Sequence, residues 1–145
     1  MVPLDLMRVP AGWRIGIVAV ALAGGLLPGC EPQDPAEAAA GRFVDRYYVE
    51  LDLTAARPHA TGLALAKLTR EAELLAGIDA PAKAGKPTIH YKLVEESGTS
   101  GPDQRSFLYE LTILFADAQV TRMALVTLQQ DPGGAWQVAN FEELR

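Results

Sequence analysis

The spacing of hydrophobic residues changes part-way along the chain, and this change limits the folds that the chain can adopt. Between about residues 35 and 76, hydrophobic residues recur every three or four positions, which is the spacing of an amphipathic helix. From residue 88 onwards they alternate with polar residues, as in a strand with one buried face. The sequence therefore predicts an α+β fold in which helices come first and a sheet follows.

The first helix has a clear start signal. Asp34 is a suitable N-cap, Pro35 suits the first helical position, and Glu37 places a carboxylate three residues after the cap. The apolar stripe of this helix comprises Ala36, Ala40, Phe43, Val44, Tyr47 and Leu51. Asp45 and Asp52 fall opposite the stripe, so we expect both carboxylates to be solvated.

Two further helices are expected before the loop over residues 78–87. Asp52 can cap a short second helix that continues to Ala56. A third helix is predicted over residues 63–76, with Gly77 placed to end it. Lys67 lies four residues before Glu71, a spacing at which the two side chains can pair on one helix face.

The second half of the domain predicts four strands. The alternating segments are residues 88–96, residues 106–115, a segment that begins near Gln119, and residues 135–141. Residues 97–103 and 131–134 are rich in turn-forming residues, and residues 116–118 are short enough for a hairpin. We expect an antiparallel meander of four strands.

The N-terminal 30 residues resemble an export signal. Arg8 and Arg14 form a basic start, residues 15–27 form an apolar core, and Cys30, the only cysteine, follows at once. The segment is similar to a bacterial lipoprotein signal, in which Leu27 and Gly29 match the expected pattern before the cysteine and Pro28 departs from it. This resemblance implies that Cys30 carries fatty acyl chains such as palmitate and anchors the protein to the membrane of a bacterial cell envelope, on the extracytoplasmic side.

Other interpretations of this segment stay open. A transmembrane helix is disfavoured, because spanning the bilayer takes about 20 apolar residues and this run is shorter. Ordinary signal cleavage and an uncut anchor are the remaining alternatives. Asp5 does not suit a basic start, so translation from Met7 is as plausible as translation from Met1.

The predicted organisation is a signal over residues 1–30, a tether over residues 31–34 and one α+β domain over residues 35–145. Removing Arg8, Arg14 and Asp5 from the 13 basic and 18 acidic residues leaves 11 and 17, a net charge of -6. An acidic domain without a Lys/Arg cluster is a poor candidate for binding nucleic acid. We therefore expect no nucleic-acid partner.

The order of helices and strands, together with a closing strand over residues 136–142 that begins with Trp136, resembles the nuclear transport factor 2-like superfamily. Ketosteroid isomerase belongs to that superfamily. The resemblance implies a cone-like fold with the first helix packed in the concave face of a curved four-stranded sheet. A cystatin-like roll without a pocket is the alternative.

Five aromatic residues are candidates for lining a cavity at the mouth of such a cone, although such residues more often fill a core. They are Phe43, Tyr47, Tyr91, Tyr109 and Trp136. A buried tyrosine hydroxyl or indole N–H needs a hydrogen-bond partner, which favours an end that is open to water.

The enzymes that resemble this fold use a carboxylate or a His/Asp pair in an apolar pocket. Here Glu50 lies one turn after Arg46 and is expected to pair with it, and neither His59 nor His90 has an obvious partner. We predict no catalytic residue, no cofactor and no metal site.

The outer sheet face offers a different kind of function. Leu108 and Leu114 lie opposite the core residues of their strand, and the third strand is apolar on both faces. Such a face favours a homodimer or a protein partner, although Lys92, Glu110 and Arg122 are expected to interrupt it. The sequence thus favours a membrane-tethered, non-catalytic binding or assembly protein, and the alternative is a small-ligand binder or isomerase-like enzyme that uses the interior of the cone.

Overall fold

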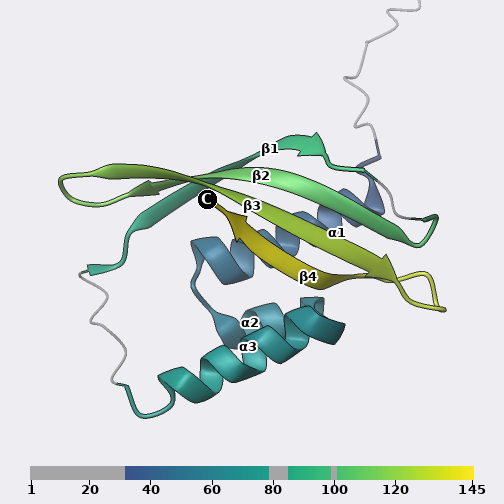
Figure 1. Cartoon of the computed structure of the whole chain (residues 1–145), viewed down its shortest axis with the longest axis horizontal. Coiled ribbons are helices and arrows are strands. Elements are labelled where there is room, and N and C mark those ends of the chain that lie inside the picture. Colours follow the sequence, from purple (N-terminus) through teal and green to yellow (C-terminus); the bar gives the residue numbers. More distant parts are fainter. Residues whose placement is uncertain (1–31, 79–84, 99–100) are drawn as a thin grey trace, which may run out of the picture. The chain divides into compact units, whose positions relative to one another are not determined.

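The computed structural model describes residues 32–78, 85–98 and 101–145, which belong to one compact unit, Glu31–Arg145. The predicted signal and Cys30 lie outside the described residues, so their predictions stay open. In chain order the elements are α1 (Pro35–Val44), the π-helical turn η1 (Asp45–Val49), α2 (Leu53–Ala56), the 3-10 turn η2 (Arg57–His59), α3 (Gly62–Leu75), β1 (Thr88–Glu96), β2 (Gln104–Leu114), β3 (Gln119–Gln130) and β4 (Trp136–Leu144). Helices lie on one side of the sheet (Figure 1).

The four strands form one antiparallel sheet in the order β1-β2-β3-β4, and the sheet is not closed. This confirms the predicted α+β fold and the predicted meander. Tyr109 lies opposite Leu93 on β1 and Ala124 on β3, and Val126 lies opposite Phe141 on β4. These residues share the inner face of the sheet, which packs against the helices because alternate side chains of a strand point to the same side.

The core lies between this inner face and the first helix. The helix contributes Ala36, Ala40, Phe43 and Val44, all without exposed surface, and the sheet contributes the buried side chains Phe107, Tyr109, Leu111, Ala124, Val126, Leu128 and Val138. The small alanine side chains allow the helix to approach the sheet closely. Burying the larger side chains supplies most of the stabilisation, at about 25 cal/mol for each Å² of apolar surface removed from water.

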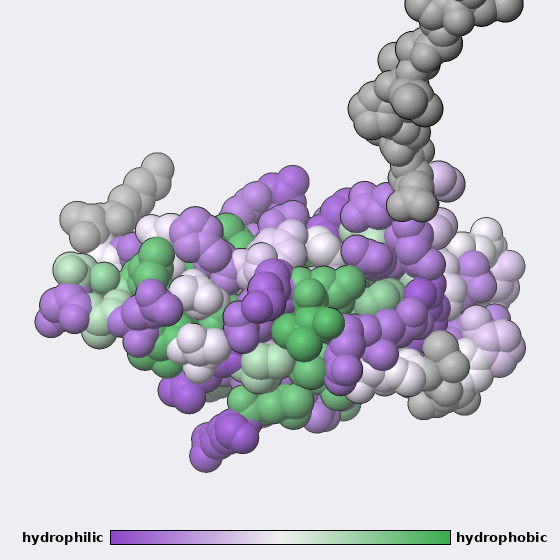
Figure 2. Space-filling model, turned by 90° about the horizontal axis from the view of Figure 1, so that it is seen from above, coloured by the Kyte–Doolittle hydropathy of each residue, from purple (hydrophilic) through white to green (hydrophobic). Residues whose placement is uncertain are grey.

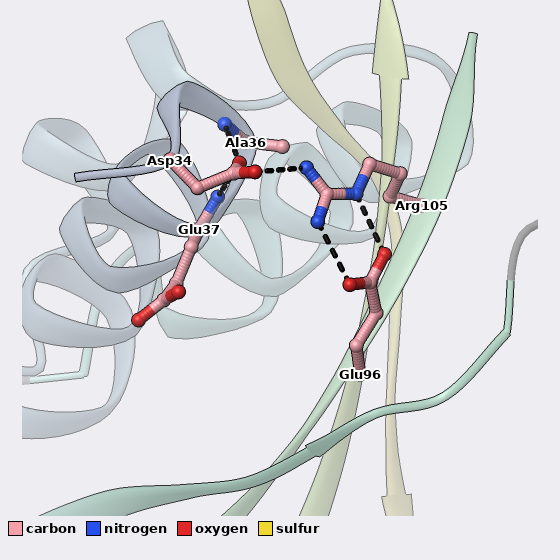
Figure 3. Close-up of polar contacts among 5 residues, drawn as sticks. All are labelled: Asp34, Ala36, Glu37, Glu96 and Arg105. Carbon is pink, nitrogen blue, oxygen red and sulfur yellow. Dashed lines mark hydrogen bonds and ion pairs between the residues drawn. The ribbon is translucent and has the colours of Figure 1, made fainter. Parts of the chain in front are cut away.

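The predicted cap of α1 is present, and an arginine from the sheet holds it. Oδ1 of Asp34 accepts hydrogen bonds from the backbone N–H groups of Ala36 (2.8 Å) and Glu37 (3.2 Å). Its Oδ2 accepts from Nη1 of Arg105 at 2.6 Å, and Arg105 also donates from Nε (2.7 Å) and Nη2 (2.8 Å) to Glu96 (Figure 3). The start of α1 is thereby joined to both β1 and β2.

The end of the first helix differs from the prediction. In η1 the backbone N–H of Glu50 donates to the carbonyl of Asp45 (2.8 Å), a π-type bond that inserts one extra residue into the turn. The extra residue shifts the helical phase, so that Tyr48 becomes buried while Leu51 is 44% exposed. Placing Leu51 on the buried stripe was therefore wrong.

Helix α3 also departs from the expected pairing. Nζ of Lys67 donates to Oδ1 of Asn140 (2.8 Å) and to the carbonyl of Phe141 (2.7 Å), both on β4, instead of pairing with Glu71. Nζ also lies 5.2 Å from the centre of the Phe141 ring. Lys67 thus fixes α3 to the edge strand, and the Glu71 carboxylate is left for another partner.

Candidate ligand-binding cavity

A cavity of about 410 Å³ lies between the inner face of the sheet, η1 and the second half of α3. Most of its wall is apolar, and this part includes Leu51, Leu53, Leu75, Ile89, Leu111 and Ile113. The volume falls in the range of small-molecule sites, which are mostly apolar with a few polar groups that orient the ligand.

Two adjacent tyrosines of η1 bring polar groups to the cavity wall. The Tyr47 hydroxyl donates to Oε2 of Glu71 on α3 over 2.9 Å. The Tyr48 side chain is 5% exposed, and its hydroxyl has no hydrogen-bond partner within the part of the chain that the structure describes. The two rings meet edge to face with their centres 4.7 Å apart. In a regular α-helix, one of these two adjacent side chains would point away from the interior. The π turn brings both tyrosines against it.

Both tyrosines of η1 remain protonated over the physiological range. Burial raises the pKa of Tyr47, and the hydrogen bond to the Glu71 carboxylate raises it further. Burial also raises the pKa of Tyr48, with smaller contributions from the negative charges of Glu143 and Glu71. Each hydroxyl therefore keeps a proton to donate, and only that of Tyr47 has a protein acceptor.

Leu51 lines the cavity in a strained backbone conformation. Its φ angle is +56°, in the left-handed region that residues other than glycine rarely adopt. Such a conformation costs of order 1–3 kcal/mol and is found preferentially at functional sites. Leu51 lies between η1 and α2, and the next residue, Asp52, caps α2 by accepting a 2.9 Å hydrogen bond from the Ala55 N–H.

Charged side chains flank the cavity. Arg122 of β3 and Glu143 of β4 both line it and both are exposed to solvent. Within residues 32–78, 85–98 and 101–145, neither of them forms a salt bridge, and neither does Glu71. The lining therefore carries two carboxylates and one guanidinium.

The lining differs from the set of aromatics predicted from the sequence. Tyr47 lines the cavity, whereas Phe43 and Tyr109 are buried in the core with 0% and 2% exposure. Tyr91 and Trp136 are partly buried and pack against that core. The first helix covers the middle of the inner sheet face, so the aromatic residues there meet helix side chains instead of open space.

Sequence reasoning missed Tyr48 and Glu71. Tyr48 lay one position off the expected helical stripe, and Glu71 was taken as a partner of Lys67. The signal available for Tyr48 was the tyrosine pair itself, because two consecutive aromatics near a helix end cannot both be solvated without exposing much apolar surface.

A second group of aromatics lies on the other side of the first helix. The Tyr91 and Tyr109 rings are 5.7 Å apart in an edge-to-face arrangement, and the Tyr109 hydroxyl is buried without a partner among the described residues. Burial, followed by the nearby Asp45 carboxylate, raises the pKa of Tyr91 to about 12. Asp45 lies beside Tyr91 and is half-buried, and it does not line the cavity, as its place opposite the apolar stripe predicted.

The remaining charged candidates lie away from the cavity. Arg46 donates to Glu50 at 2.6 Å and 2.7 Å, which confirms the predicted pair. His59 lies in η2, where burial and the charges of Arg42 and Arg46 lower its pKa. His90 is exposed on β1. Across the described ranges, no group of three or more His, Cys, Asp or Glu residues is arranged to hold a metal ion.

The outer sheet face has a mixed character. Leu108 lies directly opposite Leu125, and both side chains are half-buried, as is Leu114 further along β2. Figure 2, which looks onto the sheet from above, shows hydrophobic residues interrupted by hydrophilic ones. One interruption is the ion pair between Lys92 and Glu110, with N and O atoms 3.2 Å apart. The expectation that Arg122 also interrupts this face was wrong, because Arg122 is paired with Leu111 and lies on the inner face.

The part of the chain that the structure describes contains no helix with the length and apolar character needed to cross a membrane. The sequence matches no known protein family and no curated protein. Among solved structures, the chain is similar to a protein from Thiobacillus denitrificans described as a calcium/calmodulin-dependent protein kinase type II association domain. The TM-score is 0.55 at 15% identity, over 79% of this chain and 100% of that one.

It is also similar to a ketosteroid isomerase-like protein from Erwinia carotovora atroseptica, with a TM-score of 0.49 at 15% identity, over 75% of this chain and 92% of that one. At such low identity, likeness shows the fold alone. The likeness to the Thiobacillus denitrificans protein supports the α+β fold, with helices followed by a four-stranded antiparallel sheet, that the order of helices and strands predicted.

Proposed function

We propose that this protein binds a small, largely apolar molecule in the cavity between η1, α3 and the sheet, without chemically changing it. The cavity combines an apolar wall with few polar groups, which is the usual composition of a small-ligand site. Neither histidine of the chain lines it. Its one partly buried carboxylate, Glu71, already accepts a hydrogen bond from Tyr47.

The buried Tyr48 hydroxyl is the observation that carries this proposal. Leaving a buried polar group without a partner costs about 1–3 kcal/mol, so such groups are rare in folded proteins. Tyr48 lies in the cavity wall, so a molecule that enters the cavity and shifts the side chains over this hydroxyl can supply the missing partner. The Tyr109 hydroxyl is also buried without a partner among the described residues but does not line the cavity, so the missing partner supports a role in binding only together with the place of Tyr48 in the cavity wall.

Filling the cavity tests this proposal. Leu75 lines the cavity and is 50% exposed, whereas its neighbour Leu74 is 66% exposed and does not line it. We expect Leu75→Trp to abolish binding of the neutral fluorescent probe N-phenyl-1-naphthylamine, because the indole occupies the cavity. Leu74→Trp should bind the probe like the unaltered chain. Equal binding by both variants would contradict the proposal.

The proposed cellular setting is a bacterial envelope, with the protein anchored on the extracytoplasmic side of a membrane through acylated Cys30. Leu27 and Gly29 before the cysteine support this proposal, as does the polar, proline-containing segment after it. More than one acyl chain would be needed, because a single chain gives only marginal membrane binding.

Docking of a protein partner or a second copy of the chain on the outer sheet face is a second candidate function. It is supported by the opposed pair Leu108 and Leu125 and by two neighbouring exposed residues, Val94 (45%) and Leu144 (41%). The two candidates use opposite faces of the sheet, so one protein can have both functions.

A further inference from the structure

We infer that the cavity selects a cationic amphiphile, a molecule with an apolar body and a protonated amine. This inference rests on the proposed function and goes further by naming the charge of the ligand. It follows from the partners of Glu71, from the balance of charge around the cavity and from the rings beside it.

Glu71 is a half-buried carboxylate whose hydrogen-bond partner is neutral. Its Oε2 accepts from the Tyr47 hydroxyl at 2.9 Å, and within the described ranges no cationic side chain forms a salt bridge with it. Lys67, one turn earlier on α3, donates instead to Asn140 and Phe141 on β4. A carboxylate that is partly removed from water is stabilised when a positive charge is brought beside it.

The other two charged side chains of the lining do not neutralise the Glu71 carboxylate. Arg122 and Glu143 carry opposite charges, and both are exposed, so solvent screens them. They lie on adjacent strands and on the same sheet face, because Glu143 is opposite Ala124, two residues from Arg122. Their charges therefore largely offset each other, and the Glu71 carboxylate determines the sign of the potential inside the cavity.

The tyrosine rings add to the same preference. Tyr47 and Tyr48 form an edge-to-face pair beside Glu71, and a ring face attracts a nearby ammonium group. An amine end would then meet Glu71 and the two rings, while the apolar body would contact Leu111 and Ile113.

Three probes with the same hydrocarbon body and different charges test this inference on the full chain by titration calorimetry at pH 7. They are 4-phenylcyclohexylamine, which is cationic, 4-phenylcyclohexanol, which is neutral, and 4-phenylcyclohexanecarboxylate, which is anionic. We expect the amine to bind roughly tenfold more tightly than the alcohol, because only the ammonium adds a charge–charge attraction to the Glu71 carboxylate, worth about that much near a protein surface. The carboxylate should bind most weakly.

The variant Glu71→Gln keeps the size of the side chain and an acceptor for Tyr47 but removes the charge. It should abolish the preference for the amine, so that the amine and the alcohol bind this variant equally tightly. Glu73→Gln, on the exposed face of the same helix, is the matched control and should behave like the unaltered chain. Circular dichroism establishes that each variant is folded.

The outcomes separate this inference from the proposed function. If the alcohol binds but the amine has no advantage, or if Glu71→Gln retains the preference for the amine, the inference is overturned and the proposed function stands. If none of the three probes binds, both are overturned.

Discussion

The Tyr47 hydroxyl donates to Oε2 of Glu71 over 2.9 Å, joining residues 24 positions apart at the wall of the cavity. Tyr47 lies in the π turn η1 and Glu71 lies in the second half of α3. This bond is one of few polar links between the two helical segments, so it helps to hold one side of the cavity in place. It also leaves the adjacent Tyr48 hydroxyl without that acceptor.

The two tyrosines should therefore respond in opposite directions when their hydroxyls are removed. Tyr47→Phe breaks a partly buried hydrogen bond to a carboxylate and should lower the free energy of unfolding by about 1–2 kcal/mol. Tyr48→Phe removes a buried hydroxyl without a partner and should raise it by about 1 kcal/mol. Urea denaturation measures both. A large loss of stability in Tyr48→Phe would mean that its hydroxyl already has a partner in the unliganded protein.

The cluster of Asp34, Glu96 and Arg105 should make stability depend on acid pH. Hydrogen bonds from Arg105 are the main cause that lowers the pKa of both Asp34 and Glu96 in the folded protein. A carboxyl group with a lowered folded pKa stabilises the fold above its unfolded pKa, and this contribution is lost as the pH falls through the folded value.

The stabilisation by Arg105 should accordingly be complete at pH 7 and should decline below about pH 4, where unfolded Asp and Glu begin to bind protons. Arg105→Gln should thus be less stable than the unaltered chain at pH 7, and the difference should shrink in acid. Urea midpoints between pH 7 and pH 2.5 measure this. A difference that stays constant with pH would show that Arg105 acts through packing, for example on the Phe107 ring 5.1 Å away.

The lipid anchor is tested by changing Cys30 to Ser in the full-length chain expressed in a bacterium. We expect the unaltered protein to fractionate with membranes and the variant to be released, because the serine hydroxyl does not replace the thiol that the acyl chain requires. Intact-mass measurement of membrane-extracted protein provides the second readout. An unmodified Cys30 in that sample would exclude the anchor.

Replacing Leu108 and Leu114 with Ser tests the outer sheet face. Both side chains are half-buried and lie away from the cavity, so the double variant should stay folded and bind the cavity probes normally. Sedimentation velocity should show weaker self-association than in the unaltered chain if a second copy docks there. An unchanged sedimentation profile, with partner capture also unchanged, would show that this face is not a docking surface.

The sheet was predictable from sequence because alternation specifies both a strand and its buried face. The segment expected at residues 106–115 forms β2 at Gln104–Leu114, and the one expected at residues 135–141 forms β4 at Trp136–Leu144. The start of α1 was also predictable, because Asp34 acts on N–H groups only two and three residues away. These features depend on local chemistry, which the sequence displays directly.

The cavity was less predictable because its parts come together only in the folded chain. The π turn changes the backbone hydrogen bonding, and the spacing of hydrophobic residues in the sequence does not indicate it. Tyr48 faces inward because of this turn. The contact between Tyr47 and Glu71 depends on how α3 packs, and that packing is fixed by Lys67 reaching β4. An i,i+4 spacing predicted a local pair here, and tertiary contacts gave both side chains different partners.

The most direct test of the central claim is a map of where a ligand binds, obtained from backbone amide NMR shifts as 4-phenylcyclohexylamine is added to the full chain. We predict saturable shifts that are concentrated at the residues around the cavity, namely Tyr47, Tyr48, Glu71, Leu111 and Ile113. Shifts confined to Leu108 and Leu125 on the outer sheet face, or no saturable shifts at all, would contradict it.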